Sequence, residues 1–91
     1  MSEGVRLDKW LWAARCFRTR SQATDACGEG LVKIAGRLAK ASHPVRVGEQ
    51  IEVITPAGRR HLTVVQVSDE RGGGEKARTL FTETDVVDDD G

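Results

Sequence analysis

Residues 6–40 decide the fold, and they read RLDKWLWAARCFRTRSQATDACGEGLVKIAGRLAK. At the start of this stretch, apolar residues recur at steps of three and four, the spacing of one face of an α-helix of about three turns. The residues on that face are Leu7, Trp10, Leu11, Ala14 and Phe17. The flank and back of the same helix, which we expect to meet solvent or a ligand, carry Asp8, Lys9, Trp12 and Arg15. The apolar face therefore predicts the first part of a hydrophobic core.

A second helix is predicted to begin at Thr19-Arg20-Ser21-Gln22, where a hydroxyl is followed three residues later by glutamine, the pattern of a capping box. Gly28 and Gly30 are expected to end it. Its inner face is made of small residues that permit close packing, namely Ala23, Ala26 and Cys27. Arg18 and Arg20 flank the start of the helix, where unpaired backbone N–H groups and the helix dipole favour an anion. We therefore expect a phosphate-binding arrangement at this end.

The segments after residue 30 predict a small, mostly antiparallel sheet. Residues 32–40 alternate around the dipeptide Ala35-Gly36, which predicts a hairpin with an exposed basic side. Further strands are expected at residues 45–47 and 51–53, and a turn at Pro56-Ala57-Gly58 leads to residues 61–67, which we expect to be the last strand. The predicted fold class is α+β, with two N-terminal helices packed on the sheet.

The C-terminal part of the chain is expected to leave this body. Residues 69–74 are typical of a flexible loop and residues 75–81 favour a short helix. Residues 88–91 are expected to be disordered, because three aspartates and a glycine have nothing to bury. We therefore divide the chain into a domain over residues 1–68, with its motif core at 6–54, and a loop, short helix and acidic tail over 69–91.

The charge of the chain is neutral overall but unevenly distributed. Residues 1–60 carry 11 basic and 6 acidic side chains, a net charge of +5, whereas residues 61–91 carry 3 basic and 8 acidic ones, a net charge of −5. A basic body with an acidic end is typical of proteins that bind a polyanion. Basic side chains release counterions on binding a phosphate backbone, and a helix pair beside a hairpin can follow the phosphates of a folded RNA.

RNA is therefore the partner that we expect, and its contacts are predicted to come from the two helices and the hairpin. The predicted contact residues are Arg6, Lys9, Trp12, Arg15, Arg18, Thr19, Arg20, Ser21, Gln22, Lys33, Arg37 and Lys40. For each basic residue taken singly, the alternative is a solvated surface that keeps the protein soluble. Trp12 either stacks on an unpaired base or receives an arginine over its ring, or else it packs against the tail of its own protein. Asp8 is expected to hold Arg6 or Arg15 in place rather than to act as a catalytic acid.

Length and composition speak against membrane proteins, metal sites and enzymes. With 91 residues the chain has room for one domain and not for a large catalytic cavity. It contains no apolar run of membrane-spanning length and no signal peptide, so we expect a cytoplasmic protein. The cysteines and histidines show neither zinc-ligand spacing nor a neighbouring nucleophile, so we expect no metal, cofactor, small-molecule substrate or catalysis. Cys16 and Cys27 are expected to pack in the core.

Four segments in this order resemble the S4 RNA-binding domain family, whose fold is also called alpha-L. They are Arg6-Leu7-Asp8, Thr19–Ala23, Gly30–Gly36 and Val45–Ile51, and the resemblance covers about residues 6–54. Residues 8–15 followed by Thr19-Arg20 are most similar to free-standing bacterial S4 domains that bind the large ribosomal subunit, in particular one that still carries a stalled nascent chain on tRNA. The resemblance implies an S4-like fold, ribosomal RNA, the large subunit and tRNA on a stalled subunit as partners, and a role in subunit recycling or stalled-ribosome rescue under stress such as heat.

Two departures and two alternatives accompany this resemblance. Ala35 stands where the family commonly has asparagine in the hairpin turn, and the acidic end replaces a basic extension. S4 domains also serve as RNA-targeting modules of pseudouridine synthases and methyltransferases, although no catalytic domain follows Ile54 here. The remaining alternative is a stress-response interaction protein whose acidic end contacts another protein while its basic body holds RNA.

Overall fold

The computed structural model of the protein describes residues 4–68 and 74–84. Its first helix, α1 (Leu7–Ala13), forms where the apolar spacing predicts it, and the residues of the predicted inner face are all buried. The helix is shorter than the three turns expected, because Arg15 adopts a left-handed φ of 63° and turns the chain after Ala14. Cys16 and Phe17 nevertheless reach the core from this turn.

The second helix, α2 (Arg20–Gly28), begins with the predicted capping box. The backbone N–H of Gln22 donates to the Thr19 hydroxyl at 3.0 Å, and the Gln22 carboxamide oxygen accepts from the backbone N–H groups of Thr19 at 3.3 Å and Arg18 at 3.1 Å. These bonds satisfy donors that a helix N-terminus leaves unpaired. The predicted inner face of small residues is buried, which confirms the orientation of the helix.

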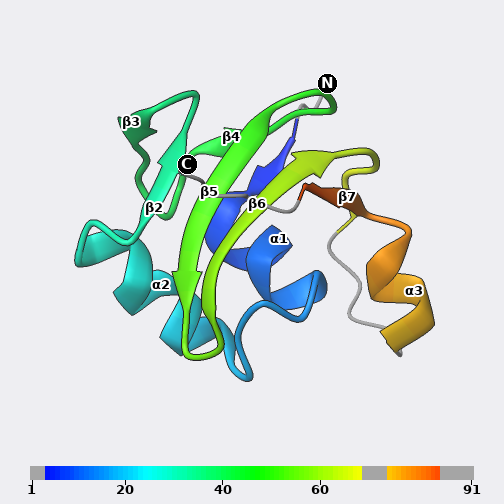
Figure 1. Cartoon of the computed structure of the whole chain (residues 1–91). Helices are drawn as coiled ribbons and strands as arrows, with labels where there is room; N and C mark the ends of the chain where they lie inside the picture. Colours follow the sequence, from blue (N-terminus) through cyan, green and yellow to red (C-terminus); the bar gives the residue numbers. More distant parts are fainter. Residues whose placement is uncertain (1–3, 69–73, 85–91) are drawn as a thin grey trace, which may run out of the picture.

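Five antiparallel strands form the main sheet in the order β3-β2-β5-β6-β7. Their bounds are β2 (Val32–Ile34), β3 (Arg37–Leu38), β5 (Gln50–Thr55), β6 (Gly58–Val64) and β7 (Phe81–Thr84). Figure 1 shows α1 and α2 on one face of this sheet. The register places Val32 opposite Val53 and Ile51 opposite Leu62, and these buried side chains form one core with the helices. The intervening residues of each strand lie on the other face.

A separate two-stranded sheet fastens the start of α1. It consists of β1 (Val5–Arg6) and β4 (Pro44–Val45), with Val5 opposite Val45. The preceding loop also accepts the first helical N–H groups, from Leu7 to the His43 carbonyl at 2.8 Å and from Asp8 to the Ala41 carbonyl at 3.1 Å. The expectation that residues 45–47 join the main sheet is wrong, because a turn at 47–48, with Gly48 at a φ of 95°, redirects the chain before β5.

Residues 74–84 pack on the same body. A short helix, α3 (Gly74–Arg78), is followed by β7, which pairs with β6. Leu80 is fully buried, and the Phe81 ring meets Trp10 edge to face with 6.3 Å between centroids. The prediction that residues 61–67 form the last strand is therefore wrong, and the packing continues past the boundary expected at residue 68. Of the loop expected at 69–74, residues 69–73 lie outside the described residues, as does the acidic end at 85–91, whereas Gly74 begins α3.

Candidate RNA-binding surface

A buried carboxylate joins the start of α1 to α2. Asp8 is 1% exposed, so the prediction that it faces solvent or a ligand is wrong. Its oxygens accept from Nε of Arg6 at 3.2 Å, from Nη2 of Arg6 at 3.0 Å and from the Thr24 hydroxyl at 2.9 Å. A guanidinium nitrogen of Arg20 lies 3.6 Å away. These three side chains cover the carboxylate, which is why residue spacing along α1 alone misplaced it.

The Asp8 carboxylate holds two arginines whose side chains remain half exposed, Arg6 at 50% and Arg20 at 43%. The expectation that Asp8 positions Arg6 is thereby confirmed. Arg20 comes from a different helix, so one carboxylate fixes the spacing of two guanidiniums that are 14 residues apart along the chain. A bidentate arginine–carboxylate contact restricts the guanidinium in direction as well as in position. The arrangement therefore presents two oriented cations to solvent.

The ionisation of Asp8 is set by opposing effects. Burial disfavours the charged carboxylate and by itself raises its pKa. The hydrogen bonds from Arg6 and Thr24 and the charges of Arg6 and Arg20 outweigh burial, so that the pKa of Asp8 lies below its ordinary value. Asp8 is therefore ionised at neutral pH and serves as a fixed acceptor for both arginines.

Four predicted contact residues lie at the cap and first turn of α2, and all four are exposed: Thr19, Arg20, Ser21 and Gln22. The hydroxyl oxygen of Thr19 and the carboxamide oxygen of Gln22 are engaged in the capping box. Arg18, also exposed, precedes the cap. An anion at this end would meet the positive end of the α2 dipole between two arginines.

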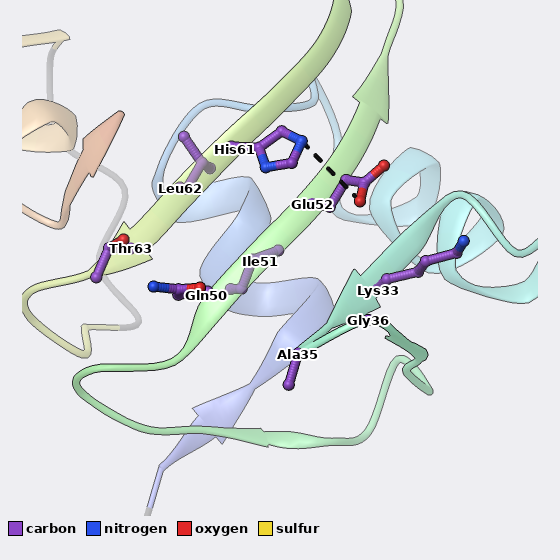
Figure 2. A pocket seen from close by; sticks show the side chains of 9 residues that line it. All are labelled: Lys33, Ala35, Gly36, Gln50, Ile51, Glu52, His61, Leu62 and Thr63. Carbon is purple, nitrogen blue, oxygen red and sulfur yellow. Dashed lines mark ion pairs between the residues drawn. The ribbon is translucent and has the colours of Figure 1, made fainter. Parts of the chain in front are cut away.

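The predicted contact residues of the hairpin lie on another surface. Lys33 is exposed between buried Val32 and Ile34, so it projects from the sheet face opposite the helices. Figure 2 shows it on that face with Glu52 and His61 of the neighbouring strands. Arg37 and Lys40 are exposed on β3 and in the loop that follows. The structure thus does not bring Lys33 together with Arg6 and Arg20.

The hairpin turn has a backbone conformation that favours residues other than alanine. Ala35 and Gly36 both have positive φ, 53° and 81°. A two-residue turn with this geometry matches the twist of the flanking strands. The left-handed region suits glycine and asparagine, whereas the Cβ of alanine meets the following carbonyl there. Ala35 is therefore a strained position within an otherwise well-formed hairpin.

The outward side of α1 carries Lys9 and Trp12, which are both partly buried. Trp12 packs against the hydrophobic core, whereas the acidic end at 85–91, part of the tail expected to cover it, lies outside the described residues. Arg15, on the turn after the helix, is exposed. The role of these three residues in RNA binding stays a prediction, as it does for the other predicted contact residues.

Arg60 is not among the contact residues predicted from the sequence. The structure shows that contacts with β7 hold its side chain in place. Its Nε and Nη2 donate to the two oxygens of Glu83 at 2.9 and 2.8 Å, and its guanidinium carbon lies 5.5 Å from the centre of the Phe81 ring. The hydrogen bond to Glu83 raises the pKa of Arg60, and the same bond lowers the pKa of Glu83. The sequence signal for this pair is the run Phe81-Thr82-Glu83-Thr84, which favours a strand, whereas the prediction from the sequence is a helix end at residue 81 followed by the acidic tail.

The remaining candidate chemistry is limited. Cys16 and Cys27 are buried free thiols, and burial raises the pKa of each to about 11. Thiols of this kind are unreactive and serve packing. Within residues 4–68 and 74–84, no three or more His, Cys, Asp or Glu side chains gather as metal ligands would. None of the helices in these two ranges has the length and apolar character needed to cross a membrane.

Comparison with known proteins places these features in a family. Residues 5–51 match the model of the S4 domain. The heat shock protein 15 homolog of Aeromonas salmonicida is 42% identical over 82 residues, which are 90% of this chain and 62% of that protein. The RQC P-site tRNA stabilizing factor of Helicobacter pylori is 35% identical over 63 residues, which are 69% of this chain and 75% of that protein.

This chain is similar to a solved structure in its fold as well as in its sequence. The trimeric structure of heat shock protein 15 from Vibrio cholerae superimposes with a TM-score of 0.85 at 41% identity, covering 90% of this chain and 83% of that one. The predicted α+β S4-like fold is thereby confirmed. This chain spans less than two thirds of the length of the Aeromonas salmonicida relative. The S4 domain model nevertheless matches more than half of the residues of this chain. The chain therefore belongs to the S4 domain family.

Proposed function

We propose that this protein is a non-catalytic, cytoplasmic RNA-binding protein that recognises structured ribosomal RNA. The observation that carries the proposal is the Asp8 network, in which a buried carboxylate orients Arg6 and Arg20 toward solvent. The negative charge of Asp8 lowers the net positive charge of this surface and so does not itself attract RNA. We therefore infer that the carboxylate serves to position the two arginines. Oriented guanidiniums are the groups that bind phosphate through two parallel hydrogen bonds.

The physical basis of binding is phosphate contact rather than base reading. The basic residues of α1, α2 and their connection release counterions when they neutralise phosphates, which supplies affinity without sequence preference. The paired helices supply shape, which matters because the major groove of an RNA helix is too deep and narrow for side chains to read. The proposed contacts are those predicted from the sequence, with Arg6, Arg18 and Arg20 at the centre.

The names of the relatives support a ribosomal partner. One relative is a heat shock protein and the other is named for stabilizing P-site tRNA in ribosome quality control, RQC. We extend this to association with the large ribosomal subunit, including one that carries tRNA on a stalled chain, and to subunit recycling or rescue under stress.

Charge reversal on the proposed contact surface tests this function. Arg15→Glu and Arg20→Glu should each weaken binding of ribosomal RNA at least tenfold while the circular-dichroism spectrum stays that of the wild type, because each replaces a phosphate contact by a repulsive charge. Arg78→Glu is the matched control, since it makes the same charge change on α3, away from α1 and α2 (Figure 1). Filter binding that gives equal affinity for all four proteins would show that the assigned surface is wrong.

A further inference from the structure

A cavity of about 560 Å³ lies between the α1–α2 connection and the turn that joins β5 to β6. Arg15, Phe17, Arg18 and Gln22 line it from the connection and α2, and the turn residues with Arg60 line it from the sheet. Figure 1 shows these two segments side by side at the same end of the molecule. The cavity is therefore formed by parts of the chain that are about 40 residues apart, and it includes the first turn of α2.

The wall of this cavity carries an excess of basic side chains, although one of them, Arg60, is paired with Glu83 outside the lining. Arg15, Arg18 and Arg60 contribute guanidinium groups, and none of its described lining residues is acidic. Arg60 is held in the wall by Glu83 and by a 3.9 Å contact of Nη1 with the Cys16 sulfur. By contrast, the hollow on the solvent face of the sheet, shown in Figure 2, contains Glu52 between Lys33 and His61. Charge complementarity therefore favours a phosphate in the first cavity and not in the second.

A second, more apolar hollow of about 340 Å³ continues from this cavity along α2. The two share Phe17, Gln22, Thr55 and Pro56, and the second adds Leu31 and Ile54 to its lining. The carboxamide oxygen of Gln22 is occupied by backbone N–H groups, which leaves its amide hydrogens as donors on the shared wall. Asp25 and Glu29 lie at the far end and disfavour a second phosphate there. The lining of the two hollows suits one phosphate followed by one uncharged group.

We propose that this double hollow is a subsite for a single unpaired ribonucleotide, with its phosphate between Arg18 and Arg60 and its base against Pro56 and Phe17. The inference rests on the proposed RNA-binding function and adds to it the β5–β6 turn and Arg60. A base held in a helix could not enter the apolar hollow, because its faces are covered by stacking. The subsite therefore selects loops, bulges or ends of RNA, where bases are free to be splayed out.

The test is a glutamate placed in the subsite. Ala57 is exposed in the turn that lines the cavity, so Ala57→Glu adds a carboxylate there without disturbing the core. Val47→Glu is the matched control, because Val47 is an exposed loop residue at the opposite end of β5. The probes are a fluorescent 12-nucleotide single-stranded RNA and a blunt RNA duplex of the same length, with thermal unfolding as the folding control.

We expect Ala57→Glu to weaken single-strand binding at least fivefold, with little effect on the duplex, and Val47→Glu to leave both unchanged. Arg18→Gln should reduce the slope of log K against log salt for the single strand by about 0.7, the value for one phosphate contact. Equal weakening of single strand and duplex by Ala57→Glu would overturn the base-binding part. If Ala57→Glu binds as the wild type while Arg20→Glu is weakened, the subsite is wrong and the proposed function stands. If neither variant is affected, the proposed function fails as well.

Discussion

Replacing Asp8 by asparagine separates positioning from simple charge. Asp8→Asn removes a negative charge from a basic surface, which by Coulomb's law alone should strengthen RNA binding. A phosphate about 7 Å away in water gains only roughly 0.6 kcal/mol from this change. The arginines, however, lose the acceptor that fixes them, and immobilising a long side chain on binding costs about 0.5–1.5 kcal/mol each. Positioning should win, so we expect binding to weaken about threefold or more.

The same substitution should lower the free energy of unfolding. Asp8 accepts two hydrogen bonds from Arg6 and one from Thr24, and bonds to a charged group contribute about 1.5–3 kcal/mol each. Because the arginine side chains are half exposed and can be solvated again, and because asparagine keeps part of the network, we expect a loss of about 1–3 kcal/mol in all. Urea unfolding at pH 7 measures this loss, and Asp25→Asn, which removes an exposed acidic charge from α2, is the control.

The pH dependence has a definite sign. The pKa of Asp8 is lower in the folded protein than in the unfolded chain, so its contribution is complete above the unfolded value of about 3.9 and is lost as pH falls through the folded value. The stability difference between wild type and Asp8→Asn should therefore persist at pH 7 and shrink below about pH 4. An Asp8→Asn protein that unfolds at the wild-type urea concentration and binds RNA at least as tightly would refute the positioning role.

Three further predictions address the turn, the cysteines and the acidic end. Ala35→Asn should raise the free energy of unfolding by about 0.5–1 kcal/mol, because asparagine tolerates the left-handed conformation, whereas Ala57→Asn, at negative φ, should give no such gain in the same urea series. Cys16 and Cys27, with pKa values of about 11, should hardly react with iodoacetamide at pH 8 until the protein is unfolded, since only about one thiol in a thousand is ionised there; rapid labelling of the folded protein would contradict their burial. Removing residues 85–91, which carry Asp85, Asp88, Asp89 and Asp90, should raise RNA affinity mainly at 50 mM salt and little at 200 mM. If the truncated and the untruncated protein bind RNA with the same affinity at each of the two salt concentrations, this end does not compete with RNA.

Local sequence patterns predicted the helices well. The three- and four-residue spacing of apolar residues identified the buried face of α1, and the hydroxyl of Thr19 with Gln22 identified the start of α2. Both features depend on residues within one or two turns of each other, so the sequence contains all the information needed. The hairpin around Ala35-Gly36 was predictable for the same reason.

Long-range contacts explain what the sequence did not predict. Asp8 is buried because Arg20 and Thr24, 12 and 16 residues away, cover it, and periodicity along α1 carries no trace of that contact. Arg60 and Glu83 are 23 residues apart, and only the pairing of β6 with β7 brings them together. Glu83 was assigned to an acidic tail from composition, although the neighbouring Phe81, Thr82 and Thr84 favour a strand. The uneven net charge of the chain thus predicted a polyanionic partner, whereas the positions of the charged side chains relative to one another could be known only from the folded structure.

The measurement that tests the central claim most directly is sedimentation of the full-length protein with purified ribosomal particles. Large subunits, small subunits and intact ribosomes are each centrifuged with wild-type protein and with Arg20→Glu at 50 and 200 mM salt. We predict that the wild type pellets with free large subunits, that the fraction bound falls as salt rises, and that Arg20→Glu stays in the supernatant. Wild-type protein that remains in the supernatant with every ribosomal particle at both salts would contradict the proposed function.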